Sequence, residues 1–187
     1  MSQPTLFDDY RPADALITGP YRYWLTRTWD PDGPVLCLIM LNPSKADAAA
    51  DDPTITRCRR RAMRQEYRGK RFGSIVVVNL YAWRATDPDG LLTWAPGGML
   101  RVVRPDAVGP DNDRHITERA RAADLVVAAW GAHRFAEARA ADVRRLLAGV
   151  PLMCLGTVAS GAPRHPLFVP YDTPLTPLPA HPAPVAL

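Results

Sequence analysis

The sequence predicts an α/β fold in which helices cover both faces of a central, mainly parallel sheet of four strands, giving three layers. Two observations support this prediction. Short apolar runs alternate with longer segments that carry helix signals. Each apolar run is continuous rather than alternating, as is typical of a strand buried on both faces. A single domain over residues 1–187 is expected, since this length is sufficient for one core.

The N-terminal part is predicted to form a strand pair. Residues 16–29 alternate enough to indicate a β-hairpin, and Gly19-Pro20 interrupts them as a turn would. The two ends of the chain, residues 1–15 and 175–187, are expected to be loosely ordered, and the second of these is irregular and rich in proline.

The first buried strand, residues 35–41, leads into the most informative segment of the chain. Pro43 follows this strand, and because proline cannot donate to a sheet ladder the strand should end there. Asp52 is placed to cap a helix with Pro53 in its first turn, and this helix should end near Gly69. The loop between strand and helix lies where open α/β sheets bind ligands.

The remaining elements alternate in the same way. Three further apolar runs predict strands, an Asp- and Pro-rich stretch predicts a long loop, and two segments predict helices. The predicted strands cover residues 74–80, 124–130 and 151–155. The predicted loop covers residues 86–98, and the predicted helices cover residues 111–121 and 135–147.

Composition limits the class of protein. No apolar run approaches the length of a membrane span and no signal-like N-terminus is present, so a cytoplasmic protein without a membrane partner is expected. Cys37 and Cys154 lie in apolar runs and are expected to be buried thiols. There is no CxxC pair and no zinc-like spacing, and no obligate protein partner is evident.

The net charge of +4 is unevenly distributed. Residues 57–71 form a dense basic segment of the kind that attracts phosphates. Contact with nucleic acid is one interpretation, and a solvated helix face in an arginine-rich chain is the other.

Polar residues at the strand ends mark the candidate site. In a parallel sheet these ends share one edge, so Asn42, Asn79 and His165 are expected to approach one another. Asn79 interrupts an apolar run, so its amide either reads the edge of a planar ligand or bonds to neighbouring backbone. His165, before Pro166, either acts on a developing anion or is a turn histidine.

Three aspartates follow the first strand: Asp47, Asp51 and Asp52. One of them could position a water or bind a ligand amine, although helix capping is the favoured role for Asp52. Ser44 lacks a nearby histidine and no GxSxG motif occurs, which disfavours serine hydrolysis. No phosphate-cradling glycine loop follows a strand, and neither a metal nor a cofactor is predicted.

Several motifs together resemble DUF1643, a bacterial and phage family of unknown function. They cover the chain from about Tyr21 to Phe168 and include LNPSKADAAADDPTITRC, VVNLYAWRATDP, VGPDNDRHI, AWGAHR and LGTVASGAPRHPL.

The order of these motifs is also similar to that of the uracil-DNA glycosylase superfamily, whose fold agrees with the one predicted above. Asn42-Pro43-Ser44 resembles its first motif, which reads Asn-Pro-Gly in the mismatch-specific branch. SIVVVNLYAWR is similar to the strand whose asparagine reads the flipped base, which would be Asn79. PRHPLF is similar to the His-Pro motif of the loop that inserts into DNA, which places His165 at the catalytic histidine.

The second resemblance implies a monofunctional DNA glycosylase without a metal. It would flip a base from duplex DNA and hydrolyse its N-glycosidic bond to leave an abasic site. His165 would stabilise the leaving base and Asn42 would hold the attacking water. The base would be held by Pro43, Ser44, Asp47, Asp51, Asp52 and Asn79, with Tyr81 or Trp83 stacked on it, and phosphates by Lys45, Arg57, Arg61, Arg84 and Arg164.

The chain departs from the superfamily pattern after its first motif. An aspartate in the water-activating position and the stacking aromatic are both missing there. These departures favour a modified or hypermodified pyrimidine over uracil, and an anti-phage role is a hypothesis because phage DNA is a source of such bases. The alternatives are an N-glycosidase or transferase acting on free nucleotides, and a DNA-binding module without catalysis.

Overall fold

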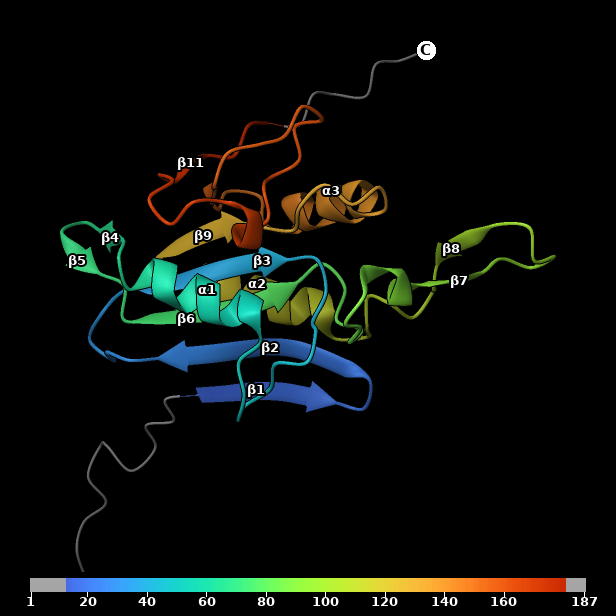
Figure 1. Cartoon of the computed structure of the whole chain (residues 1–187), viewed down its shortest axis with the longest axis horizontal. Coiled ribbons are helices and arrows are strands. Elements are labelled where there is room, and N and C mark those ends of the chain that lie inside the picture. The colour runs from blue at the N-terminus through green and yellow to red at the C-terminus, as the bar shows by residue number, and fades with distance from the viewer. Residues whose placement is uncertain (1–12, 181–187) are drawn as a thin grey trace, which may run out of the picture.

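A computed structural model describes residues 13–180 of the chain and is drawn in Figure 1. A seven-stranded sheet forms its centre, with the strands in the order β1-β2-β6-β3-β9-β10-β11. The sheet is mixed, because β1, β2 and β11 run antiparallel to their neighbours and the rest are parallel. The strands are Ala13–Thr18, Tyr21–Thr28, Val35–Met40, Ser74–Asn79, Leu125–Ala128, Leu152–Cys154 and Thr176–Pro177, corresponding to β1, β2, β3, β6, β9, β10 and β11.

The prediction of an α/β fold is confirmed, but a sheet of only four strands is wrong. The four apolar runs do form the mutually parallel strands β6, β3, β9 and β10. The sheet is larger because the hairpin β1-β2 pairs with β6 and the short strand β11 pairs with β10. Both additions include residues that were expected to be loosely ordered, since residues 13–15 lie in β1 and residues 176–177 form β11. The rest of the two predicted loose ends lies largely outside the described residues.

Helices cover both faces of the sheet (Figure 1). Helix α1, Pro53–Ala62, packs on one face, where Ile55 and Cys58 contact alternate residues of the central strands such as Leu36. Helices α2, Asn112–Ala122, and α3, Ala136–Leu146, pack on the other face against residues such as Ile39. Strand β3 is therefore buried on both sides, which explains its continuous apolar sequence.

Helix α1 is shorter than predicted. It ends at Ala62, and a two-stranded hairpin of β4, Glu66–Tyr67, and β5, Lys70–Arg71, follows it. Arg68 and Gly69 both have positive φ values, of 52° and 79°, and these fit a tight turn rather than a helix. The basic segment 57–71 is thus divided between a helix and a hairpin.

The stretch predicted as a long loop also has local structure. A 3-10 turn, η1, spans Pro88–Leu91, and β7, Leu92–Trp94, pairs with β8, Arg101–Val103. This second hairpin projects from the body of the molecule in Figure 1.

The described part of the chain contains no helix that is long and apolar enough to cross a membrane. All three cysteines are buried and free, as predicted for Cys37 and Cys154. Burial raises the pKa of the Cys37 and Cys58 thiols to about 12, so both stay protonated at neutral pH.

Candidate functional site

A cavity that includes the predicted site opens at the carboxyl ends of the parallel strands. Its volume is about 670 Å³, within the usual range of small-molecule sites. The cavity brings together the three residues that were expected to converge, Asn42, Asn79 and His165. Further polar residues that line it are Arg22, Ser44, Asp52, Thr54, Thr86 and His133. Its apolar lining includes Met40, Leu41, Ile55, Trp130, Val158, Leu167 and Phe168.

Asn79 lies at the floor of the cavity and is 1% exposed. Its Oδ1 accepts a hydrogen bond from Arg22 Nη2 at 3.3 Å. Its Nδ2 is buried and has no protein acceptor among residues 13–180. Since the guanidinium of arginine can only donate, this contact assigns the oxygen of the carboxamide to Arg22 and leaves the nitrogen as a free donor.

Side chains from two helices bind the backbone around Asn79. Asn112 Nδ2 donates to the carbonyl oxygens of Asn79 and Leu80 at 3.0 and 3.1 Å, and Arg139 Nε donates to the Leu80 oxygen at 2.9 Å. Both supporting side chains are buried and come from the helices on one face. The end of β6 is therefore fixed on both its backbone and its side chain, as a recognition residue requires.

Asn42 presents an acceptor to the cavity. Its Nδ2 donates to the carbonyl oxygens of Ala85 at 2.7 Å and Pro43 at 3.1 Å, which fixes the orientation of the amide. No donor among the described residues bonds to Asn42 Oδ1, so this atom is available to a water or a ligand.

His165 is the N-cap of the short 3-10 turn η2, Pro166–Phe168. Its Nδ1 accepts from the Leu167 N–H at 3.3 Å. Burial, with a smaller contribution from nearby His133, lowers the pKa of His165 below the ordinary value, so the ring is neutral at neutral pH. A neutral ring that accepts at Nδ1 carries its proton on Nε2, which makes Nε2 the donor of a ring that borders the cavity.

The structure separates the three aspartates. Asp47 Oδ1 accepts from the N–H groups of Ala49 and Ala50, and this lowers the pKa of Asp47. Asp51 pairs with Arg27 at 2.6 Å. Neither carboxylate borders the cavity, because both are engaged in local structure, so this cavity does not support their predicted role in substrate binding. Asp52 alone lines the cavity.

Asp52 also caps helix α1, as favoured from the sequence. Its Oδ1 accepts from the Ile55 N–H at 2.8 Å. A cap uses one carboxylate oxygen and leaves lone pairs on the other. The same side chain can therefore hold the helix and face a ligand.

The cavity does not support the predicted stacking of Tyr81 or Trp83 on a base. The Tyr81 hydroxyl donates to the Phe135 carbonyl oxygen at 2.8 Å and lies in the core. Trp83 packs under the Arg104 guanidinium, which is 3.4 Å from the ring centroid. Neither ring borders the cavity. Of the other two predicted base contacts, Ser44 lines the cavity, whereas Pro43 is buried and does not. The aromatic wall of the cavity comes instead from Trp130 and Phe168.

The structure gives Arg57 and Arg61 backbone partners within the protein, which does not support their predicted role in phosphate binding. Arg57 donates to the carbonyl oxygens of Pro166 and Val169, at 2.9 and 2.6 Å. Arg61 is 2% exposed and donates to the oxygens of residues 169, 170, 171 and 173. These arginines attach the segment after His165 to helix α1. Of the other predicted basic contacts, Lys45 and Arg164 are exposed and Arg84 is half-buried.

Replacing Arg61 with methionine should lower the free energy of unfolding by about 3 kcal/mol, because several carbonyl groups lose a buried donor at about 1–3 kcal/mol each and water restores part of that loss. Urea unfolding followed by circular dichroism measures this. Arg60→Met on the exposed side of the same helix is the control and should change stability by less than about 0.5 kcal/mol. Equal losses in the two variants would contradict the stabilising role of the bonds from Arg61 to the segment after His165.

The protein should lose stability as the pH falls below about 6.5. Burial is the main cause that lowers the folded-state pKa of both His165 and His115, so the unfolded chain binds protons more readily below the ordinary histidine pKa. Above this pH both histidines are neutral and the protein has its full stability. Stability is lost as the pH decreases through the folded-state pKa of the two histidines. Urea midpoints at pH 7.5 and 5.5 measure the change, and His165→Asn should make it smaller. A midpoint that rises on acidification would refute this.

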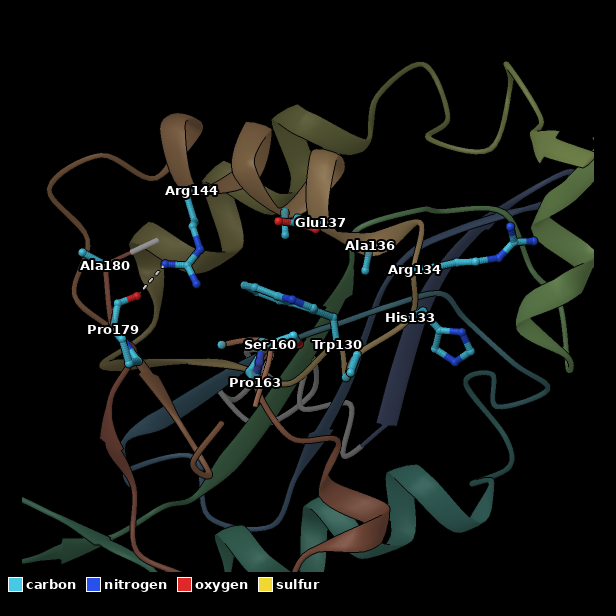
Figure 2. Close-up of a pocket in the computed structure, with 15 residues that line it drawn as sticks. Trp130, His133, Arg134, Ala136, Glu137, Arg144, Ser160, Pro163, Pro179 and Ala180 are labelled. Atoms are coloured by element: carbon cyan, nitrogen blue, oxygen red, sulfur yellow. Dashed lines mark hydrogen bonds between the residues drawn. The ribbon is translucent and has the colours of Figure 1, made fainter. Parts of the chain in front are cut away.

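A second, smaller cavity of about 230 Å³ lies on the other side of the strand end that carries Trp130 (Figure 2). Figure 2 shows the indole of Trp130 between Arg144 of α3 and the loop that contains Ser160 and Pro163. Arg144 Nη1 donates to the Pro179 carbonyl oxygen at 2.9 Å. Residues 130–133 border both cavities, so Trp130 supports the main cavity from behind.

Sequence reasoning missed the roles of Arg22, Trp130 and Phe168. Arg22 had a visible signal, since it is a charged residue between two tyrosines, in a strand that continues with Trp24 and Leu25. Phe168 is 80% exposed at the cavity rim, and only the position of the loop after His165 reveals it. Within residues 13–180, no three histidine, cysteine or acidic side chains gather closely enough to hold a metal ion.

Comparison with known proteins gives one match. A family model described as "Protein of unknown function (DUF1643)" matches residues 22–167. No curated protein and no solved structure matches the chain. The resemblance to the uracil-DNA glycosylase superfamily gains no support from these comparisons and depends on the motifs alone.

Proposed function

The chain belongs to the DUF1643 family, whose function is unknown, and from its cavity we propose that it is a DNA glycosylase that hydrolyses the N-glycosidic bond of a flipped, modified pyrimidine. One observation carries the proposal: a proton donor, His165, and two acceptors, Asn42 and Asp52, line the same cavity as the buried amide of Asn79. This set contains the groups that hydrolysis of a nucleoside requires.

His165 assists departure of the base. When the bond between C1′ of the sugar and the base nitrogen breaks, its electron pair moves to the base, which leaves as an anion. The Nε2–H of the neutral imidazole donates to this developing charge. The hydrogen bond from the Leu167 N–H to Nδ1 keeps the proton on Nε2, so the donor is set before the substrate arrives.

Asn42 and Asp52 assist the attacking water. Asn42 Oδ1 accepts one hydrogen of the water, and the Asp52 carboxylate accepts the proton that is released as the oxygen bonds to C1′. That proton is later returned to the departed base through solvent. One water is consumed, and the products are an abasic sugar and a free base.

The surroundings of the cavity suit a DNA strand. Phe168 exposes most of its ring at the rim, next to the loop that carries His165. An exposed aromatic residue can fill the stack when a base is flipped out. Lys45 and Arg164 are exposed basic residues of the segments that follow β3 and β10, and they are the proposed phosphate contacts together with Arg84.

The proposal is tested with duplex and single-stranded oligonucleotides that each contain one uracil, 5-hydroxymethyluracil, 5-hydroxymethylcytosine or glucosylated 5-hydroxymethylcytosine. After incubation with the protein, alkali cleaves any abasic site. We expect strand breaks with at least one modified pyrimidine and none with the unmodified control strand. Intact DNA across the whole set would overturn the proposal.

The same assay separates the alternatives. Duplex binding requires a steep fall in affinity with rising salt, because phosphate contacts release counterions. Hydrolysis of free nucleotides with little dependence on salt would favour a nucleotide N-glycosidase. Salt-dependent DNA binding without any abasic product would favour a binding module. An anti-phage role predicts that excision is strongest on a base found only in phage DNA.

A further inference from the structure

The floor of the cavity contains a buried cation. Arg22, in β2, is 2% exposed and borders the cavity. Its Nη1 donates to the Ala46 carbonyl oxygen at 2.9 Å and its Nη2 to Asn79 Oδ1 at 3.3 Å. No ion pair joins it to a carboxylate in the part of the chain that the structure describes, and its Nε has no partner there.

An unpaired buried charge is unfavourable for folding alone. Burial lowers the pKa of Arg22 to about 10, so the group remains charged at neutral pH. Its contacts do not form a fold-stabilising network of the kind that Arg61 makes with the loop after His165. The feature that Arg22 does determine is the orientation of Asn79.

The contact with Arg22 leaves Asn79 as a donor only. Its oxygen accepts from a guanidinium, while Nδ2 is buried and has no acceptor among the described residues. A buried donor without a partner costs about 1–3 kcal/mol, which a bound ligand with an acceptor would recover. Asn79 Nδ2 is thus a buried donor without an acceptor among the described residues, and an electron-rich atom of a ligand can supply that acceptor.

We propose that Arg22 is a positioning residue that orients Asn79 as a donor, and that the cavity selects bases with a carbonyl oxygen or an unprotonated ring nitrogen at the edge facing Asn79. This inference rests on the proposed function for its ligand class. As the glycosidic bond breaks, negative charge spreads to such ring atoms and the hydrogen bond from Asn79 strengthens. The charge of Arg22 behind the amide increases this effect, so the pair stabilises the transition state more than the bound substrate.

The main test is Asn79→Asp. This change keeps the shape of the side chain, removes both donors and places a carboxylate beside Arg22. The unfolding midpoint should therefore be kept or raised, while the single-turnover rate on the best oligonucleotide of the set above falls by about 10²-fold or more. The affinity for free uracil and cytosine, measured by calorimetry, should fall by at least about tenfold, because one hydrogen bond to the base is lost.

Arg22→Met tests the positioning role. The wild-type protein should excise 5-fluorouracil only modestly faster than uracil, since the Arg22–Asn79 pair already stabilises the leaving base. The variant should show a larger ratio, because a poorer leaving group depends more on this stabilisation. A merely structural role would lower both rates by one factor. Arg27→Met is the matched control, since Arg27 is a buried arginine of the same strand outside the cavity, and its loss should lower stability without changing this ratio.

The outcomes separate the two proposals. If Asn79→Asp excises or binds bases as well as the wild type, the donor role is overturned and the glycosylase proposal is not. If the wild type binds free bases and the variant does not, but no DNA is cleaved, the inference holds and the glycosylase fails. If uracil is not excised, the leaving-group ratio is measured on the corresponding pair of the base that is. A wild type that neither cleaves DNA nor binds a base overturns both.

Discussion

Asp52→Asn should reduce the single-turnover excision rate by about 10²–10⁴-fold, the usual contribution of a general base, and leave the protein folded. Asparagine caps helices about as well as aspartate, so its side-chain oxygen can still accept from the Ile55 N–H. The variant therefore keeps the start of helix α1 and loses only the negative charge at the cavity wall. Abasic-site formation measured with alkali, at enzyme in excess over DNA, reports the rate.

Asp51→Asn is the matched control. Asp51 is adjacent in sequence but pairs with Arg27 at 2.6 Å and with Arg59 at 3.6 Å, outside the cavity. Its replacement should lower the urea midpoint and leave the rate within about twofold, since it removes an ion pair rather than a catalytic group. If Asp51→Asn and Asp52→Asn were equally active, Asp52 would serve as a cap alone.

The contrast between these two aspartates shows what the sequence could predict. The cap at Asp52 was predictable because it depends on local spacing before Pro53. Which of the three carboxylates faces a ligand was not, because that depends on how the loop after β3 folds against β2. Arg27 decides the position of Asp51, and the partnership joins residues 24 positions apart.

The parallel strands were predictable for a similar reason. A strand such as β3 is buried on both faces, and its composition records this directly. The end of helix α1 was not, since the arginines after Ala62 have high helix propensity and the positive φ values of Arg68 and Gly69 decide against a longer helix.

Arginine was the residue type that sequence reasoning read least well. A basic cluster predicts phosphate contact when its side chains are solvated. Arg57 and Arg61 instead bind backbone carbonyls of the segment after His165, and Arg22 binds Asn79. The carbonyl groups that Arg57 and Arg61 bind in this proline-rich segment are not paired in a sheet. A guanidinium group has several donors and can therefore bind several of these carbonyl oxygens at once. Two basic residues of the cluster thus position the loop that carries the proposed catalytic histidine.

His165→Asn should lower the excision rate by about 10²–10³-fold, the usual effect of removing a donor to a developing anion. The oxygen of asparagine occupies a position close to that of histidine Nδ1 and can accept from the Leu167 N–H, so the cap of η2 is preserved. The shorter side chain has no group in the position of Nε2, and the donor toward the base is lost. Rates are measured under single turnover with the oligonucleotide that the wild type cleaves best.

His165→Gln separates reach from structure. Glutamine is long enough to place an amide N–H near the position of Nε2, so it should recover part of the rate that His165→Asn loses. Both variants should keep the unfolding midpoint near that of the wild type at pH 7.5. If His165→Asn were as active as the wild type, the turn histidine would be the correct interpretation, and stabilisation of the leaving base would fall to the amide of Asn79, which borders the same cavity.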